Sequence, residues 1–336
     1  MRVEISTVSD DEIVAHVDGR ALRLGALTGG RVYEVSGLAV RTLSRPPGEL
    51  LCRFATVNDL HFGELECGDL DGHRGSGGTL CVGPGEPPHP VMMNGAAAAE
   101  IAAIEPAAVI AKGDLTAGGR ASEFAEFRAC YAAFGPRLHV IRGNHDTYGG
   151  LTEYSGDAVL DLPGVRLVLL DTTFPGRHEG FLTREQLELV ATAAAEADRP
   201  VMVFGHHHVE LPGETYAAVA PGLAPADSRA LVGLLASTPA ILGYFAGHTH
   251  RNRAIRPPAA RGAVFVEVAC VKDFPGSWAE YRVYAGGVMQ VHRRISSPAA
   301  LAWSERCRSL YAAAGVDYAA YAFQRSEDRC FTLTPR

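Results

Sequence analysis

Residues 138–146 read LHVIRGNHD, and the prediction of the fold starts from this stretch. Its first half is a short apolar run that stops at Gly143, and the polar side chains of Asn144, His145 and Asp146 follow at once. Such a pattern is typical of a buried strand that delivers chemically active side chains at its carboxyl end. One occurrence is a weak signal, because turns favour glycine, asparagine and aspartate for backbone reasons alone.

The same pattern recurs four more times along the chain. An apolar run followed by residues that can bind a metal occurs in FATVNDLH (54–61), AAVIAKGD (107–114), VMVFGHHH (201–208) and ILGYFAGHTH (241–250). Neighbouring parallel strands place their carboxyl ends at the same edge of a sheet. We therefore expect these strand ends to meet and to form one functional site.

The composition limits the class of protein. Of the 336 residues, 47% are hydrophobic and 21% are charged, which is the balance of a globular chain that folds in water. The formal net charge of -7 argues against a general nucleic-acid binder and against adsorption to anionic membranes. The acidic N-terminal sequence does not read as an export signal, and we expect no membrane span. The 7 cysteines, without any C-x-x-C spacing, favour a reduced, cytoplasmic protein.

The spacing of the apolar runs predicts three parts. Residues 1–48 contain short alternating runs, which predict five strands in a small β unit that needs a neighbour to bury its core. Residues 49–297 are the expected catalytic domain, where alternating strands and helices predict an α/β fold with helices on both faces of a sheet. Within it, the three runs at 263–294 are expected to be antiparallel strands. Residues 298–336 read as a helical, then irregular tail without an assigned role.

Local patterns place the helices and one long loop. Helices are expected at residues 96–104 and 120–134, and the aromatic residues of the second have the spacing of a core-facing side. Thr183 and Gln186 have the spacing of a capping box that opens another helix. The loop 63–90 is rich in glycine and proline and long enough to be functional, so it is either a lining of the active site or a mobile connection.

The polar residues at the strand ends are nitrogen and oxygen ligands without a thiolate, a set that suits Zn, Mn or Fe. They are Asp59, His61, Asp114, Asn144, His145, His206, His207, His208, His248 and His250. So many ligands exceed one tetrahedral site but match two metals that share a bridging carboxylate, for which Asp114 is the natural candidate. Two such ions bind both oxygens of a phosphoryl group and acidify a bridging water to a hydroxide nucleophile. Phosphoester hydrolysis is the reaction that needs this arrangement.

Five short motifs carry a resemblance to a known family. In order along the chain they are Asp59-x-His61, Gly113-Asp114, Gly143-Asn144-His145-Asp146, Gly205-His206 and Gly247-His248-Thr249-His250. They resemble the five motifs of the calcineurin-like metallophosphoesterases, and the match covers residues 59–250. The resemblance implies a four-layer αββα sandwich, which here follows the small N-terminal β unit.

The resemblance also implies a ligand set. One metal would be held by Asp59, His61, Asp114 and His250. A second would be held by Asp114, Asn144, His206 and His248. The family's non-ligand histidine corresponds to His145, which would touch the substrate and protonate the leaving group. Its neighbour Asp146 would orient the residues around it.

One motif departs from the family pattern. The fourth motif often reads His-x-Pro, whereas here three histidines follow Gly205. By alignment His206 is the ligand, and His207 and His208 are candidates for contact with the substrate. Arg251, directly after the last motif, is a third candidate.

The last motif and the compact ligand order are most similar to the bacterial cyclic nucleotide phosphodiesterase and glycerophosphodiesterase branch. The expected function is therefore hydrolysis of a small-molecule phosphodiester, with 3',5'-cyclic nucleotides as candidate substrates. Arg142, Arg251 and Lys112 lie beside the motifs and offer the extra positive charge that a monoester needs, so a phosphomonoesterase or protein phosphatase remains the alternative. A catalytically silent scaffold is the other alternative, and a homodimer stays open.

Overall fold

Two six-stranded sheets form the centre of the molecule. The computed structural model describes residues 2–68, 79–211 and 220–335. The first sheet has the order β17-β16-β15-β6-β7-β8. Its strands are β6 (Leu50–Val57), β7 (Ala108–Lys112), β8 (Leu138–Ile141), β15 (Ser277–Tyr284), β16 (Gly287–Arg294) and β17 (Phe331–Leu333). The second sheet has the order β13-β14-β12-β11-β10-β9. Its strands are β9 (Ala158–Leu162), β10 (Val165–Leu169), β11 (Val201–Phe204), β12 (Ile241–Ala246), β13 (Arg253–Ile255) and β14 (Val264–Glu267).

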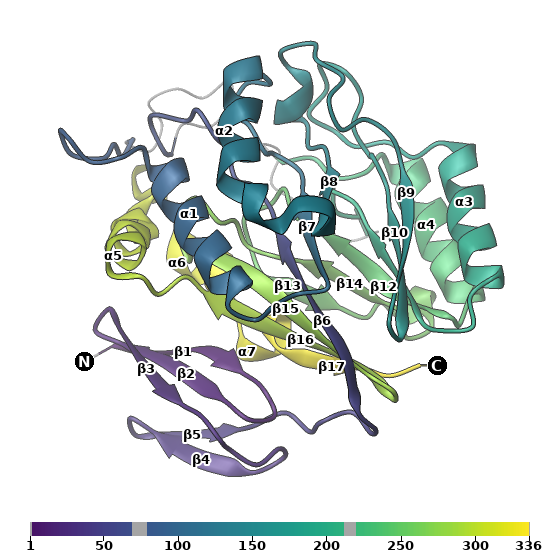
Figure 1. Ribbon diagram of the computed structural model, residues 1–336, viewed down its shortest axis with the longest axis horizontal. Helices are drawn as coiled ribbons and strands as arrows, with labels where there is room; N and C mark the ends of the chain where they lie inside the picture. The colour runs from purple at the N-terminus through teal and green to yellow at the C-terminus, as the bar shows by residue number, and fades with distance from the viewer. Residues whose placement is uncertain (1, 69–78, 212–219, 336) are drawn as a thin grey trace.

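Helices cover the outer faces of the sheets (Figure 1). The first sheet packs against α1 (His89–Ala102), α2 (Ala121–Tyr131), α5 (Pro298–Arg306) and α6 (Tyr318–Phe323). The second packs against α3 (Arg184–Ala195) and α4 (Pro225–Ser237). The remaining helices are α7 (Ser326–Arg329) and the 3-10 turns η1 (Ala132–Arg137), η2 (His145–Thr147), η3 (Pro258–Ala260), η4 (Cys307–Ser309) and η5 (Ala312–Ala314). The predicted four-layer αββα sandwich is thus confirmed.

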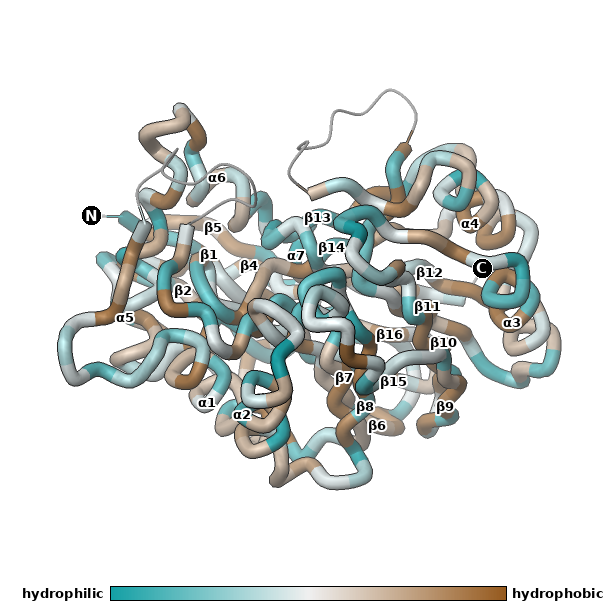
Figure 2. Tube along the Cα trace, turned by 90° about the horizontal axis from the view of Figure 1, so that it is seen from above, coloured by the Kyte–Doolittle hydropathy of each residue, from teal (hydrophilic) through white to brown (hydrophobic). Residues whose placement is uncertain are grey.

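Three hydrophobic clusters separate these layers. The cluster between the two sheets is built on aromatic residues, and Phe54 stacks on Tyr281 with ring centroids 4.5 Å apart. Strands buried on both faces read as continuous apolar runs, and every residue of β7 is buried accordingly. Figure 2 shows hydrophobic stretches along these central strands. The aromatic residues of α2 and η1 face the core, as their spacing predicts: Phe124, Phe127, Tyr131 and Phe134.

One local expectation is wrong, and another is confirmed only in part. The helix expected at 96–104 begins earlier, at His89, because Pro90 in its first turn needs no hydrogen-bonded N–H there. The runs at 263–294 were expected to be antiparallel strands, and β14 does pair antiparallel with β13, but its other neighbour in the second sheet, β12, runs parallel to it. Strands β15 and β16 pair antiparallel with each other, as expected. The capping box is present, since Thr183 accepts a hydrogen bond from the Gln186 amide at 3.2 Å.

The N-terminal residues form the five predicted strands. They are β1 (Val3–Val8), β2 (Ile13–Val17), β3 (Arg20–Leu24), β4 (Val32–Val35) and β5 (Leu38–Arg41), arranged as a three-stranded and a two-stranded sheet. Their own core is small, so contacts with the first large sheet matter. Arg282 of β15 pairs with Asp10 at 2.8 Å, and Arg293 of β16 pairs with Glu12. Both arginine side chains are nearly buried.

The C-terminal residues are part of the sandwich. The last strand, β17, pairs antiparallel with β16 at the edge of the first sheet. Trp303 of α5 and Tyr318 of α6 are buried in the cluster beneath the first helical layer. The tail therefore contributes core residues to the same sandwich. Among the described residues, no helix has the length and apolarity that a bilayer span requires.

Candidate metal centre

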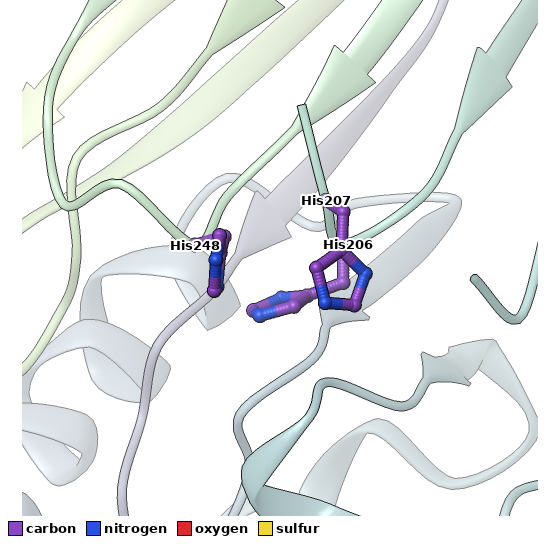
Figure 3. A group of neighbouring side chains, drawn as sticks. All are labelled: His206, His207 and His248. Carbon is purple, nitrogen blue, oxygen red and sulfur yellow. The ribbon is translucent and has the colours of Figure 1, made fainter. Parts of the chain in front are cut away.

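The five predicted motifs meet where strands from both sheets end. In the first sheet, Asp59 and His61 follow β6, Asp114 follows β7 and Asn144 follows β8. In the second sheet, the histidine triplet follows β11 and the two last histidines follow β12. Figure 3 shows the His206, His207 and His248 rings gathered from the β11 and β12 loops. Groups whose ligand atoms lie within 4.8 Å of one another include Asp59, His61 and His250; His61, Asp114 and His145; and His206, His207 and His248.

The backbone at these residues is unusual. Five proposed ligands have a left-handed backbone conformation: Asp59 (φ 54), His61 (φ 50), Asp114 (φ 49), His248 (φ 71) and His250 (φ 55). A non-glycine residue held at positive φ costs of order 1–3 kcal/mol and persists where its surroundings impose it, which is common at functional sites. This clustering marks the strand ends as a site independently of the residue types.

Asp114 lies between the two halves of this centre. Its Oδ2 atom is 3.6 Å from His61 Nε2 and 3.3 Å from His206 Nε2. Its Oδ1 atom accepts a hydrogen bond from the His145 backbone amide at 3.0 Å. Burial opposes ionisation, but the neighbouring histidines hold the pKa of Asp114 well below its usual range, and Asp114 in turn raises the pKa of His206 to about 9. One carboxylate oxygen thus faces a histidine from each sheet.

The first proposed ligand group is Asp59, His61, Asp114 and His250, and carboxylates lie behind two of its histidine rings. The Nε2 atom of His250 lies 3.6 Å from Asp59 Oδ1, while its Nδ1 atom lies 3.3 Å from Asp273 Oδ2. In the same way, the Nδ1 atom of His61 lies 3.5 Å from Glu64 Oε2. A histidine that binds a metal through one ring nitrogen commonly donates its other N–H to a carboxylate or carbonyl. Both rings have that arrangement.

The second proposed ligand group is Asp114, Asn144, His206 and His248, and backbone carbonyls and a tyrosine orient its side chains. His206 Nδ1 lies 2.9 Å from the Lys112 carbonyl, which directs Nε2 toward Asp114. His248 Nε2 lies 3.0 Å from the Pro221 carbonyl. The Asn144 amide nitrogen donates to the Tyr148 hydroxyl at 2.7 Å, so its oxygen turns the other way.

Buried ligand atoms without a hydrogen-bond partner show whether the site suits metal ions. Within the described residues, three buried side-chain atoms have no hydrogen-bond partner and belong to proposed ligands: His61 Nε2, His206 Nε2 and Asn144 Oδ1. A buried polar atom without a partner costs about 1–3 kcal/mol. All three are lone-pair donors of the kind that Zn, Mn and Fe accept. The residues present therefore fit two metal ions.

Comparison with known proteins gives a family match for part of the chain. Residues 88–237 match the model of the calcineurin-like phosphoesterase superfamily domain. This part of the chain carries a calcineurin-like phosphoesterase domain. The matched residues include Asp114, Asn144 and His206, whereas the first and last motifs lie outside them.

Curated relatives of the chain are named as phosphodiesterases. A 3',5'-cyclic adenosine monophosphate phosphodiesterase of Pseudomonas aeruginosa is 30% identical over 149 residues, which are 43% of this chain and 54% of that protein. A cAMP/cGMP dual specificity phosphodiesterase of Mycobacterium tuberculosis is 29% identical over 160 residues, 44% of this chain and 49% of that protein. A glycerophosphodiester phosphodiesterase of Enterobacter lignolyticus is 28% identical over 159 residues, which are 43% of this chain and 56% of that protein. The chain spans about half the length of these relatives.

A solved structure shares the fold. A dimetal phosphatase from Danio rerio superposes with a TM-score of 0.57 and 16% identity, over 74% of this chain and 98% of that one. At 16% identity this likeness concerns the fold alone.

Two residues of the Asn-His-Asp motif have distinct environments. His145 is half-buried, and its Nδ1 atom lies 2.9 Å from the Ala117 carbonyl. Asp146 is fully buried and accepts hydrogen bonds from the amides of Leu115, Thr116 and Gly143 at 3.2, 2.9 and 2.8 Å. Burial and the nearby Asp114 raise the pKa of Asp146 to about 6, although these hydrogen bonds oppose the shift. Asp146 thus joins two of the phosphoesterase motifs.

Two glycines allow the motifs to approach each other. Gly113 has φ +85, and a Cβ atom there would lie 2.4 Å from His206 Nδ1. A Cβ atom on Gly143 would lie 2.2 Å from Asp114 Oδ1. Neither distance is sterically possible, so any side chain at these positions would displace a proposed ligand.

The two extra histidines of the triplet are buried. His207 Nδ1 lies 2.8 Å from the Thr172 hydroxyl, and its Nε2 lies 3.1 Å from the His178 carbonyl. Although the His207 ring is close enough to His206 and His248 to form a ligand group, both of its nitrogens already have protein partners, which favours a packing role. The His208 ring lies 6.1 Å from that of His248 and is only 2% exposed.

The three cations beside the motifs all have protein partners. Arg142 pairs with Asp171 at 2.6 Å, and Arg251 pairs with Glu267 at 2.8 Å. Lys112 is buried and donates to the Ala246 carbonyl at 2.6 Å, and burial lowers the pKa of its ammonium to about 7. None of these charges is directed at a substrate by its contacts.

Sequence reasoning missed the carboxylates behind the histidines. Asp273 and Glu64 are close to the second nitrogens of His250 and His61. Asp273 lies beyond the last family motif, and Glu64 opens the loop 63–90, so neither has a periodic or motif signal. Glu64 places the start of that loop at the site, whereas residues 69–78 lie outside the described residues.

Proposed function

We propose that the chain is a two-metal phosphodiesterase that acts on small-molecule phosphodiesters. The observation that supports this most strongly is that the unpartnered Nε2 atoms of His61 and His206 both lie close to one carboxylate oxygen of Asp114. One metal would be held by Asp59, His61, Asp114 and His250. The other would be held by Asp114, Asn144, His206 and His248. Zn, Mn and Fe are the metals that suit this donor set.

Two cations held in this way would polarise the phosphoryl oxygens and supply the attacking hydroxide from water. The protein's part is to hold the ligands rigid before substrate arrives. Asp146 links the Asp114 loop to the Asn144 turn, because its carboxylate accepts hydrogen bonds from backbone amides of both. Fixed ligands at a buried site need no rearrangement during the reaction.

His145 is the proposed general acid. Its backbone amide is fixed on Asp114, and its Nδ1 atom is held by the Ala117 carbonyl, which orients the ring. The centroid of its ring lies 4.6 Å from that of the proposed ligand His61. Half-buried at the edge of the centre, the ring would give a proton to the departing alkoxide oxygen of the substrate.

The positively charged side chains beside the site already have protein partners, which supports a diester substrate. A monoester dianion needs more positive charge than a diester, but Arg142 and Arg251 are engaged with carboxylates and Lys112 with a carbonyl. The relatives with cyclic nucleotide and glycerophosphodiester phosphodiesterase names agree with this choice. We therefore propose 3',5'-cyclic nucleotides as the first substrates to test.

We expect the protein to hydrolyse bis(p-nitrophenyl) phosphate with a kcat/KM about 10-fold or more above that for p-nitrophenyl phosphate. The reason is that one missing charge-assisted contact to the monoester is worth roughly 1.5 to 3 kcal/mol. The measurement is turnover of both compounds by one manganese-loaded preparation, with chelator-treated protein as the blank, followed by cyclic AMP. Monoester turnover far above diester turnover would overturn the diester assignment in favour of a phosphomonoesterase or protein phosphatase.

Two further proposals concern the domain boundaries and the cellular location. We propose residues 49–297 as the catalytic domain, with residues 1–48 as a packed accessory unit and 298–336 as its C-terminal segment. We also propose a cytoplasmic location, because all seven cysteines are free thiols, which a reducing compartment preserves.

A further inference from the structure

Asp273 is a buried carboxylate that links the C-terminal segment to the metal centre. Its Oδ2 atom lies 3.3 Å from His250 Nδ1. Its Oδ1 atom accepts hydrogen bonds from the Tyr318 hydroxyl at 2.7 Å and from the Cys270 thiol at 2.8 Å. The side chain is fully buried, so these partners determine where it lies. Tyr318 therefore fixes the carboxylate that faces His250.

The helix that carries Tyr318 also touches the loop that carries His250. In α6, the Tyr321 hydroxyl donates to the Thr249 carbonyl at 2.9 Å. The Asn252 backbone amide and side-chain amide both donate to the Ala322 carbonyl at 3.0 Å. Residues on either side of His250 are thus bound to this one helix.

A parallel set of contacts reaches His61. Trp303 of α5 donates from Nε1 to the Lys272 carbonyl at 2.9 Å. The Lys272 ammonium pairs with Glu64, whose Oε2 atom lies 3.5 Å from His61 Nδ1. The segment 298–336 therefore supports the Lys272 and Asp273 pair, which stands behind both histidines of the first metal group.

We propose that Tyr318 is a positioning residue for the metal held by Asp59, His61, Asp114 and His250, and that α6 belongs to the catalytic unit for this reason. The proposal rests on the proposed function and names a part of the chain outside the family match at 88–237. Groups behind a metal-binding histidine fix its ring and strengthen it as a ligand, and losing one commonly lowers metal affinity by about 10- to 100-fold.

Tyr318→Phe is expected to weaken binding of one ion by about 10-fold, at the low end of that range because Tyr318 acts through Asp273. Affinity for the other ion should stay unchanged. The measurement is calorimetric titration of chelator-stripped full-length protein with Mn²⁺. Asp273→Asn, which keeps the size of the side chain, should cause at least as large a loss at the same ion.

Tyr281→Phe is the matched control, because it removes a buried tyrosine hydroxyl that donates to Gln290 on the neighbouring strand of the first sheet at 2.9 Å. Both tyrosine variants lose one buried hydrogen bond, worth about 1 kcal/mol, so their metal-free Tm values should fall similarly. Only Tyr318→Phe should show a smaller rise of Tm on adding Mn²⁺. Unchanged affinity for both ions in Tyr318→Phe and Asp273→Asn would overturn the proposal. Wild-type protein that binds no ion would overturn the proposed function, and this inference with it.

Discussion

Asp114→Ala is expected to lower the affinity for both metal ions by more than about 100-fold and to reduce phosphodiester hydrolysis to background. The loss of a group behind a ligand already costs about 10- to 100-fold, and Asp114 is itself the proposed shared ligand. Its Oδ2 atom is close to His61 Nε2 and to His206 Nε2, one from each proposed ligand group. The measurements are metal content by mass spectrometry and turnover of bis(p-nitrophenyl) phosphate.

Asp161→Ala provides the control for Asp114→Ala. The Asp161 side chain is 47% exposed and pairs with Arg166 on the surface of the second sheet, so its removal should leave metal content and turnover unchanged. An Asp114→Ala protein that keeps two ions and a normal rate would show that another carboxylate bridges them. Asp171 is a poor candidate for that carboxylate, because it pairs with Arg142 at 2.6 Å.

His145→Ala is expected to keep both ions and to lose about 10²- to 10⁴-fold in rate on a substrate with an alkoxide leaving group, such as cyclic AMP. A positioned general acid contributes most when the leaving group needs a proton. The loss should therefore be smaller for p-nitrophenolate, which departs without one. The measurement is kcat/KM for both substrates, together with metal content.

His139→Ala is the control for this substitution, since His139 lies within β8 and outside the proposed centre. Equal losses on both substrates in His145→Ala would mean that this side chain stabilises phosphoryl charge rather than giving a proton. Loss of an ion would instead make His145 a ligand, as its closeness to His61 and Asp114 allows.

Much of the fold was predictable because strands buried on both faces leave continuous apolar runs. The run of β7 has that form, and each of its residues is buried. The parallel pairing of β14 with β12 was not predictable, because an apolar run looks the same in either sheet and only tertiary contacts decide which strand lies beside it. The early start of α1 at His89 was hidden by the proline that follows it.

Many of the proposed ligands were predictable, because they directly follow a glycine at the end of an apolar run. The close approach at Gly143 to Asp114 explains why the motif needs glycine there. The groups behind the ligands were not predictable, because Asp273 and Tyr318 reach His250 only through the packing of distant segments. The left-handed backbone of Asp59 and His61 likewise arises from the folded environment and has no glycine to announce it.

The most direct test of the two-metal account is the metal content of wild-type protein purified without chelator. Elemental analysis should find about two ions of Zn, Mn or Fe per chain, as two ligand groups joined by one carboxylate require. Stripping the ions should abolish diester hydrolysis, and adding Mn²⁺ should restore it. Well under one ion per chain, with no hydrolysis recovered on adding Mn²⁺, would contradict the account and favour a catalytically silent scaffold.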